Sequence, residues 1–158
     1  MSRTSISRPD IVAFMQRASS ALKSNLDPPK DVFSFGEGVG DPHDELLELA
    51  LSGKKTATTS YPAPSPPHWD VGDLSVILGA SGEPRAIMRT LSFHQCLFKD
   101  VPVAFALAEG EGPYEEYRQG HFRYYHRRDG NTEFGDDSMV LCETFEVIYS
   151  EGVRKSDG

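Results

Sequence analysis

The chain has 158 residues, the length of one ordinary domain and enough to bury a hydrophobic core without disulfides or metal ions. Its 24 acidic residues outnumber its 16 lysines and arginines, and the net charge of −8 excludes a wholly basic nucleic-acid binder but not a local basic site. Hydrophobic residues make up 38% of the chain, which is too many for a disordered protein, and no apolar run approaches the roughly 18–20 residues of a membrane-spanning helix.

The cysteines and histidines predict neither a disulfide scaffold nor a metal site. Cys96 and Cys142 are too few for either a disulfide framework or a four-thiolate zinc site. His43, His68 and His94 lack the spacing of a metal-binding motif, so we expect no metal and no cofactor. With no secretory h-region at the N-terminus, the sequence favours a cytoplasmic protein with free thiols and no membrane contact.

Helical periodicity appears at four places. Asp41 is a plausible N-cap for the second of these helices, Pro42 suits its first turn, and Gly53 follows its last apolar residue. The expected helical ranges are 9–24, 43–52, 103–108 and 114–128.

Strand-like stretches rich in β-branched and aromatic residues lie between these helices. A turn over 79–84 joins two of them into a hairpin. Because the helices are inserted at irregular places rather than alternating with strands, the order favours an α+β fold over a doubly wound sheet. The expected strand ranges are 32–35, 55–61, 73–78, 85–93 and 138–149.

The first candidate chemical feature is a lysine pair that leads into a hydroxyl-rich strand. A partly desolvated Lys55 could take a proton from the hydroxyl of Thr58. Adjacent residues entering a strand point opposite ways, so only one lysine of the pair can face such a site. Lys55 and Thr58 are an odd number of residues apart, so they converge only if Lys55 still lies in the turn. The alternative is a solvated lysine pair at a helix C-terminus.

The second feature is the segment Glu109-Gly110-Glu111-Gly112, which follows the short helix. Glycines permit close approach of the backbone to a ligand, and a carboxylate held there could orient a lysine, bind a ribose hydroxyl or act as a base. The alternative is an ordinary charged loop.

The third feature is a run of basic and aromatic residues in a chain that is otherwise acidic. Residues 117–128 hold four arginines, two histidines and four aromatic residues, with no acid. On a helix Tyr117 and His121 share a face with Tyr124 or Tyr125. Aromatic rings stack on bases and guanidinium groups pair with phosphates, so a nucleotide or an RNA strand is a natural ligand. A core-facing aromatic stripe with solvated arginines is the alternative.

Taken in order, these features resemble the ASCH domain, the activating-signal-cointegrator homology family of PUA-like barrels, over about Phe33 to Tyr149. The shared markers in the first half are Phe-x-Phe-Gly from Phe33, an acidic helix from Asp44, Gly-Lys-Lys-Thr-Ala-Thr from Gly53 and Gly-Asp from Gly72. Those in the second half are the Glu-Gly-Glu-Gly turn from Glu109, His121 before an aromatic pair, and Cys-Glu-x-Phe from Cys142 in the last strand. The resemblance implies a PUA-like barrel of about five or six strands with helices packed around it. It divides the chain into a helical extension (1–30), the ASCH domain (31–150) and a polar tail (151–158).

The resemblance also implies a site. Some members hydrolyse N4-acylated cytidine, and their working set falls on Lys55, Thr58 and Glu111, with Lys54 left in solvent. We expect a nucleoside, nucleotide or short RNA as ligand. The expected ligand-binding residues are Glu109, Tyr117, Arg118, His121 and Tyr124.

Three functions remain open at this point. The first is an amidohydrolase in which Thr58 attacks, Lys55 takes its proton and Glu111 holds the lysine or activates water. The second is a ribonuclease with His121 as acid or base, and the third is a binding module without turnover. The net charge of −8 disfavours long RNA more than a single nucleoside.

Overall fold

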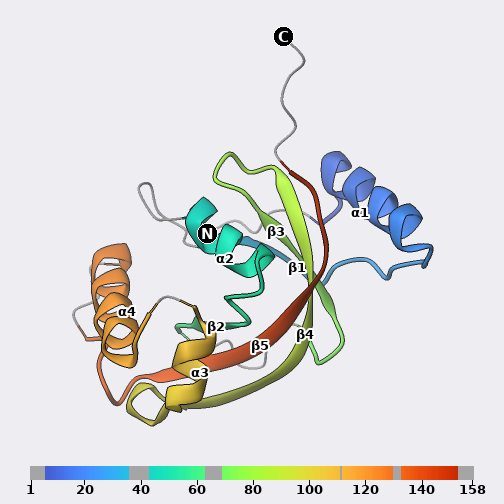
Figure 1. Cartoon of the computed structure of the whole chain (residues 1–158). Coiled ribbons are helices and arrows are strands. Elements are labelled where there is room, and N and C mark those ends of the chain that lie inside the picture. Colours follow the sequence, from blue (N-terminus) through green and yellow to red (C-terminus); the bar gives the residue numbers. More distant parts are fainter. Residues whose placement is uncertain (1–5, 36–42, 63–68, 111, 130–132, 153–158) are drawn as a thin grey trace.

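The computed structural model describes residues 6–35, 43–62, 69–110, 112–129 and 133–152. These residues form four α-helices, one 3-10 turn (Phe98–Asp100) and five strands (Figure 1). The helices are α1 (Pro9–Leu22), α2 (His43–Leu51), α3 (Val103–Ala108) and α4 (Tyr114–Asp129), and the strands are β1 (Asp31–Ser34), β2 (Ala57–Ser60), β3 (Leu74–Leu78), β4 (Pro84–Leu97) and β5 (Met139–Ser150).

The five strands form one curled, half-barrel sheet in the order β1-β3-β4-β5-β2. The β1–β3 pair is parallel and every other pair is antiparallel. The α+β class and the five strands confirm the sequence-based prediction. Among the residues that the structure describes, β2 pairs only with β5, so it forms one edge of the sheet and presents its side chains next to those of β5.

The two long strands β4 and β5 carry most of the curvature. They stay paired from Ala86 opposite Ser150 to Leu97 opposite Met139. The register shifts between Thr90 and Ser92, and such a bulge bends a strand and re-aims the side chains beyond it.

Helix α1 packs on one face of the sheet near β1 and β3. Its apolar stripe includes Ile11 and Phe14, which are fully buried against Val76 and Ile87. Figure 1 shows α1 near one end of the long strands, with α3 and α4 at the other.

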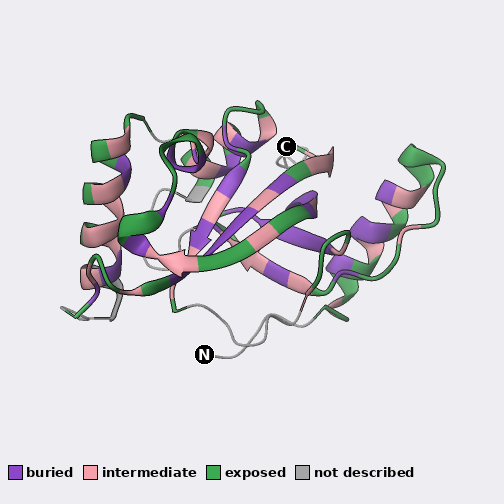
Figure 2. Cartoon of the chain, turned by 90° about the horizontal axis from the view of Figure 1, so that it is seen from below, coloured by how far each residue is buried: buried purple, intermediate pink, exposed green. Residues whose placement is uncertain are grey.

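Helix α2 packs on the opposite face. Its Leu47 belongs to a cluster that includes Ile77 and Phe145, and Ile77 alternates along β3 with Val76 and Leu78, which pack against α1. A third cluster joins α3 and α4 to the β2 end of the sheet, where Tyr117 and Val140 are buried. Figure 2 shows this distribution, with buried residues along the strands and on the sheet-facing sides of the helices.

Three elements differ from the predicted ranges by two residues or more at one end. The first helix ends at Leu22 rather than at residue 24, because Lys23 adopts a left-handed conformation (φ 52°) whose N–H caps the helix. The strand predicted over 85–93 continues to Leu97 because β5 pairs along its whole length. The strand predicted over 55–61 narrows to 57–60, so Lys55 lies before it. The proposed cap residues Asp41 and Pro42 lie outside the described residues.

Candidate functional site

Lys55 is a buried lysine at the entrance to β2. Its side chain is 2% exposed, whereas the neighbouring Lys54 is exposed. The end of α2 fixes this arrangement, because the backbone N–H groups of both lysines donate to the carbonyl oxygen of Leu49. The prediction that Lys55, and not Lys54, faces inward is therefore confirmed.

The ammonium group of Lys55 is fully engaged with acceptors. Its Nζ lies 3.2 Å from Glu109 Oε1, 3.3 Å from the carbonyl oxygen of Glu109 and 3.0 Å from that of Ala57. These three acceptors match the three N–H donors of a lysine. The Nζ atom also lies 5.4 Å from the centre of the Phe35 ring, a cation–π distance.

Glu109 lies next to Lys55 because the C-terminal end of α3 packs against the residues that precede β2. The Thr56 N–H donates to the carbonyl oxygen of Ala108 at 2.8 Å. Gly110 follows with φ +79°, and a Cβ atom there would lie 2.6 Å from the backbone oxygen of Lys54. A side chain at position 110 is thus excluded both by conformation and by space, which explains the glycine.

Glu109 is the centre of the cluster, and its own side chain is 2% exposed. Its Oε2 atom accepts a hydrogen bond from Thr59 Oγ1 at 3.0 Å and lies 3.1 Å from His121 Nε2. Burial opposes ionisation of this carboxyl, but the charges of Lys55 and His121 outweigh that penalty and lower its pKa to about 2. Glu109 is therefore a carboxylate at neutral pH.

The hydrogen bonds define the protonation of His121. Its Nδ1 lies 2.8 Å from the carbonyl oxygen of Tyr117, which can only accept, so Nδ1 carries a proton. Its Nε2 faces the Glu109 carboxylate, which also only accepts, so Nε2 carries a proton as well. His121 is thus a cation in this arrangement, with 12% of its side chain exposed.

Thr59 and Tyr117 extend the cluster through their hydroxyl groups. Because Thr59 donates to Glu109, it accepts from the Tyr117 hydroxyl, at an oxygen–oxygen distance of 2.8 Å. Burial, reinforced by the negative charge of Glu109, raises the pKa of Tyr117, which keeps the phenol in its donating form. We name the set Lys55, Thr59, Glu109, Tyr117 and His121 the Glu109 cluster.

The Glu109 cluster holds two cations and one anion in a largely water-excluded place. The excess positive charge favours a negative charge placed near it, such as a phosphate oxygen or an oxyanion that develops during a reaction. Carboxylates of low pKa are weak bases, so Glu109 is suited to holding the two cations rather than to removing a proton.

The other predicted site residues lie in different surroundings. Thr58 is half-buried on the face of β2 opposite to Thr59, which instead supplies the hydroxyl bonded to Glu109. Arg118 forms an ion pair with Asp136 at 2.6 Å, and Tyr124 packs edge-on against Tyr125. Glu111 lies outside the described residues.

A second buried carboxyl, Glu143, was not among the predicted site residues, although it belongs to the Cys-Glu-x-Phe marker of the last strand. It is 4% exposed and accepts a hydrogen bond of 2.6 Å from Thr90 Oγ1. Burial raises its pKa to about 7. Glu143 pairs directly with Thr58 across β5 and β2, and such pairs place their Cβ atoms about 5 Å apart. The available signal was an acid that directly follows the apolar run from Met139 to Cys142.

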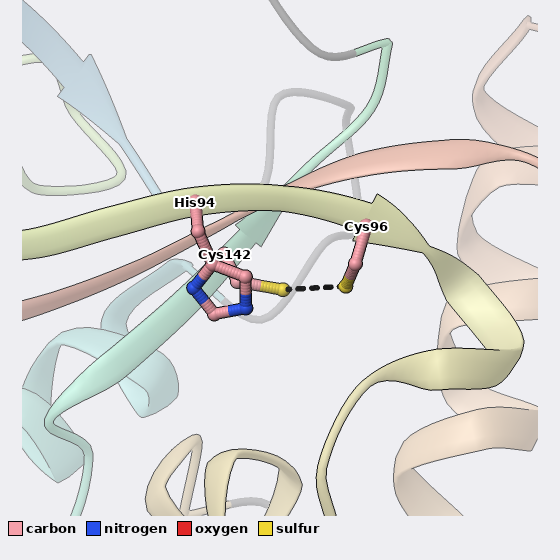
Figure 3. A group of neighbouring side chains, drawn as sticks. All are labelled: His94, Cys96 and Cys142. Carbon is pink, nitrogen blue, oxygen red and sulfur yellow. Dashed lines mark hydrogen bonds between the residues drawn. The ribbon is translucent and has the colours of Figure 1, made fainter.

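A group of potential metal ligands also forms where the sequence spacing predicted none. His94 and Cys96 on β4 meet Cys142 on β5, and their ligand atoms all lie within 4.8 Å of one another (Figure 3). Both cysteines are free, as expected. The prediction of no metal site rested on spacing along the chain, which cannot detect ligands that are paired across two strands.

Comparison with known proteins agrees with this architecture. The family model of the ASCH domain matches residues 31–149. A crystal structure of a protein from Enterococcus faecalis is similar, with 27% identity, a TM-score of 0.73 and 88% of each chain covered. An ASCH domain from Lactobacillus crispatus has 22% identity and a TM-score of 0.71, with 90% of this chain and 96% of that chain covered. No protein with a curated description matches the chain significantly.

The fold is thus that of the PUA-like α+β proteins, a curled half-barrel sheet with helices around it. The chain belongs to the ASCH domain family. Among the described residues, no helix is both long and apolar enough to cross a membrane.

Proposed function

We propose that this ASCH-domain protein binds a nucleoside, a nucleotide or a short RNA and hydrolyses the amide of an N4-acylcytidine-type base. The observation that carries the proposal is the Glu109 cluster, whose two cations and one carboxylate leave one positive charge in a low-dielectric place. A negative charge of the ligand that lies near His121, the most exposed charged member, such as the phosphate of a nucleotide, is stabilised by that charge.

Thr58 and Glu143 support a hydrolytic step. A general base works best when its pKa lies near the working pH, and the pKa of about 7 at Glu143 meets this condition. Lys55 suits the base role less well, because its ammonium group already donates to three acceptors and must lose a proton before it can accept one. In this proposal Lys55 orients Glu109, and Glu143 takes the proton of Thr58.

The reaction then runs in two balanced halves. Thr58 Oγ bonds to the acyl carbon as Glu143 takes its proton, and the carbon–nitrogen bond breaks as Glu143 returns that proton to the amine of the nucleoside. Water next attacks the Thr58 ester, Glu143 takes the water proton, and the same proton goes to Thr58 Oγ as the acid product leaves. No oxidant or further reactant is required.

The test incubates the full chain with N4-acetylcytidine, other acylated nucleosides, a nucleotide and a short RNA, followed by chromatography. We expect free cytidine from the acylated substrates. RNA fragments would favour a ribonuclease, and saturable binding without product would favour a non-catalytic module. Absence of both binding and product would overturn the proposal.

Variants of the two proposed catalytic residues sharpen this test. Thr58→Val and Glu143→Gln should each lower kcat by roughly 10²–10⁴-fold, the usual contribution of such groups, while ligand binding persists. Lys54→Ala is the matched control, because that lysine is exposed, and it should change neither parameter. In the unmodified protein kcat/KM should rise with pH through about 7, as Glu143 loses its proton. Equally mild effects of all three substitutions would contradict these roles.

A further inference from the structure

We propose that His94, Cys96 and Cys142 bind a zinc ion, with a water molecule as the fourth ligand. Two thiolates and one imidazole form a donor set that zinc prefers, and three protein ligands with one open position are typical of non-structural zinc sites. The site lies on the face of the sheet opposite to Thr58 and Glu143 and next to Thr59, and the proposal does not depend on the hydrolytic one.

The strand pairing explains why the three side chains meet. His94 and Cys96 are two residues apart on β4, so both project from the same face. Cys142 lies directly opposite His94 in the β4–β5 register, and it belongs to that same face. Figure 3 shows the three side chains together, with the two from β4 adjacent to the sulfur from β5. Paired antiparallel strands hold such ligands more rigidly than a loop does.

The distance between the two sulfur atoms fits a shared metal ion. Cys96 Sγ and Cys142 Sγ are 3.8 Å apart. Two thiolates at the usual zinc–sulfur distance of about 2.3 Å, with a tetrahedral angle between them, are separated by about 3.8 Å. A disulfide requires about 2.05 Å, so the present separation is that of two thiols that can share an ion.

The burial of the three ligands also suits an ion that enters from solvent. Cys142 is buried and Cys96 is half-buried, while His94 is exposed. The exposed imidazole gives the ion and its water ligand an entry path, while the buried sulfur shields one side of the site. Two thiolates balance the charge of one divalent zinc ion, so the occupied site is neutral.

The experiment titrates the reduced full chain with Zn²⁺ against a chromophoric chelator, and with Co²⁺ as a spectroscopic probe. We expect one ion per chain and the thiolate-to-cobalt charge-transfer absorption of a tetrahedral site. His94→Ala and Cys96→Ser should each weaken Zn²⁺ binding at least as much as the roughly tenfold caused by loss of an outer-shell partner. Both positions are accessible enough for the variants to fold, unlike the buried Cys142.

Gln95→Ala is the matched control. Gln95 lies between the two β4 ligands and projects from the opposite face, so its loss should leave the affinity unchanged. Equal Zn²⁺ affinity in the unmodified protein, His94→Ala and Cys96→Ser would overturn the proposal. A Co²⁺ spectrum without thiolate charge transfer would overturn it as well.

Discussion

Two buried carboxyl groups lie on opposite faces of the β2–β5 end of the sheet, and their chemistry differs sharply. Glu109 and Glu143 are 2% and 4% exposed, so both lose nearly all contact with water. The pKa of Glu109 is about 2, whereas that of Glu143 is about 7. Burial disfavours ionisation in both cases, and the difference comes from the neighbours: two cations beside Glu109, but a threonine hydroxyl beside Glu143.

This comparison separates two uses of a buried acid. Glu109 is permanently ionised and holds Lys55 and His121 in place, so it contributes a fixed electrostatic field. Glu143 exchanges its proton near neutral pH, so it is suited to proton transfer. The predictions below either remove the neighbours that create the difference or measure its consequences.

The largest effect is expected from Lys55→Met, which removes one of the two cations beside Glu109. Taking one partner from a buried ion pair leaves an incompletely compensated charge, and the free energy of unfolding at pH 7 should fall by about 3–5 kcal/mol. Urea denaturation measures this change. Lys54→Met, one residue away and exposed, should stay within about 0.5 kcal/mol of the unmodified protein. Similar free energies of unfolding for the two variants would show that the buried Lys55–Glu109 pair contributes no more to stability than the exposed Lys54 does.

The next effect concerns pH and Glu143. Its folded pKa of about 7 lies above the ordinary value of 4.5, so the native state binds the proton more tightly than the unfolded state does. Its contribution to stability is therefore fully present below pH 4.5 and is lost as the pH rises through about 7, a total of about 3 kcal/mol.

Glu143→Gln removes this titration. We expect the free energy of unfolding of the variant, relative to the unmodified protein, to improve by about 3 kcal/mol between pH 4.5 and pH 8. Chemical denaturation over this pH range measures the difference, and a constant difference would contradict the raised pKa. Glu109 acts in the opposite sense, since its lowered pKa gives stability that is present above pH 4.5 and lost as the pH falls through about 2.

Thr58 and Thr59 offer a matched pair on the two faces of one strand. Thr59→Val removes the hydroxyl that donates to the Glu109 carboxylate and leaves the Tyr117 hydroxyl without its acceptor. A hydrogen bond to a charged group contributes about 1.5–3 kcal/mol, so this variant should lose about 2 kcal/mol of stability. Thr58 is half-buried, so Thr58→Val should change the free energy of unfolding by about 0.5 kcal/mol or less, even though it should stop turnover. Equal losses of unfolding free energy in Thr58→Val and Thr59→Val would contradict the assignment of only the Thr59 hydroxyl to the Glu109 cluster.

Lys55 and its partner show how far the sequence could predict this site. The α+β class and the five strands followed from patterns that lie within a few residues of each other. Alternation along a strand indicated that only one lysine of the pair can face inward, and the resemblance to the ASCH domain selected Lys55. The partner of Lys55 was harder to identify, because Glu109 and Glu111 flank one glycine and only the contact between α3 and β2 distinguishes them. The role of Glu111 stays a prediction.

Which residues face each other across paired strands could not be predicted from the sequence. Glu143 faces Thr58, and Cys142 faces both Thr59 and His94, only because β5 pairs with β2 and β4 in one particular register. A shift of one residue would turn every one of these side chains to the other face. Registers between distant segments depend on the whole sheet, including the bulge after Thr90, and leave no local signal.

The smallest expected effect is that of Tyr117→Phe, which tests the direction of the hydroxyl chain. The phenol donates to Thr59, and Thr59 keeps its bond to Glu109 when the phenol is lost, so the cost should be about 1 kcal/mol, the net value of one neutral hydrogen bond. The double variant Thr59→Val/Tyr117→Phe makes the test specific. Once Thr59 is valine the Tyr117 hydroxyl is buried without its acceptor, so removing it should cost almost nothing more. Additive losses in a double-mutant cycle, measured by urea denaturation, would mean that the two hydroxyls act independently and that Tyr117 has another partner.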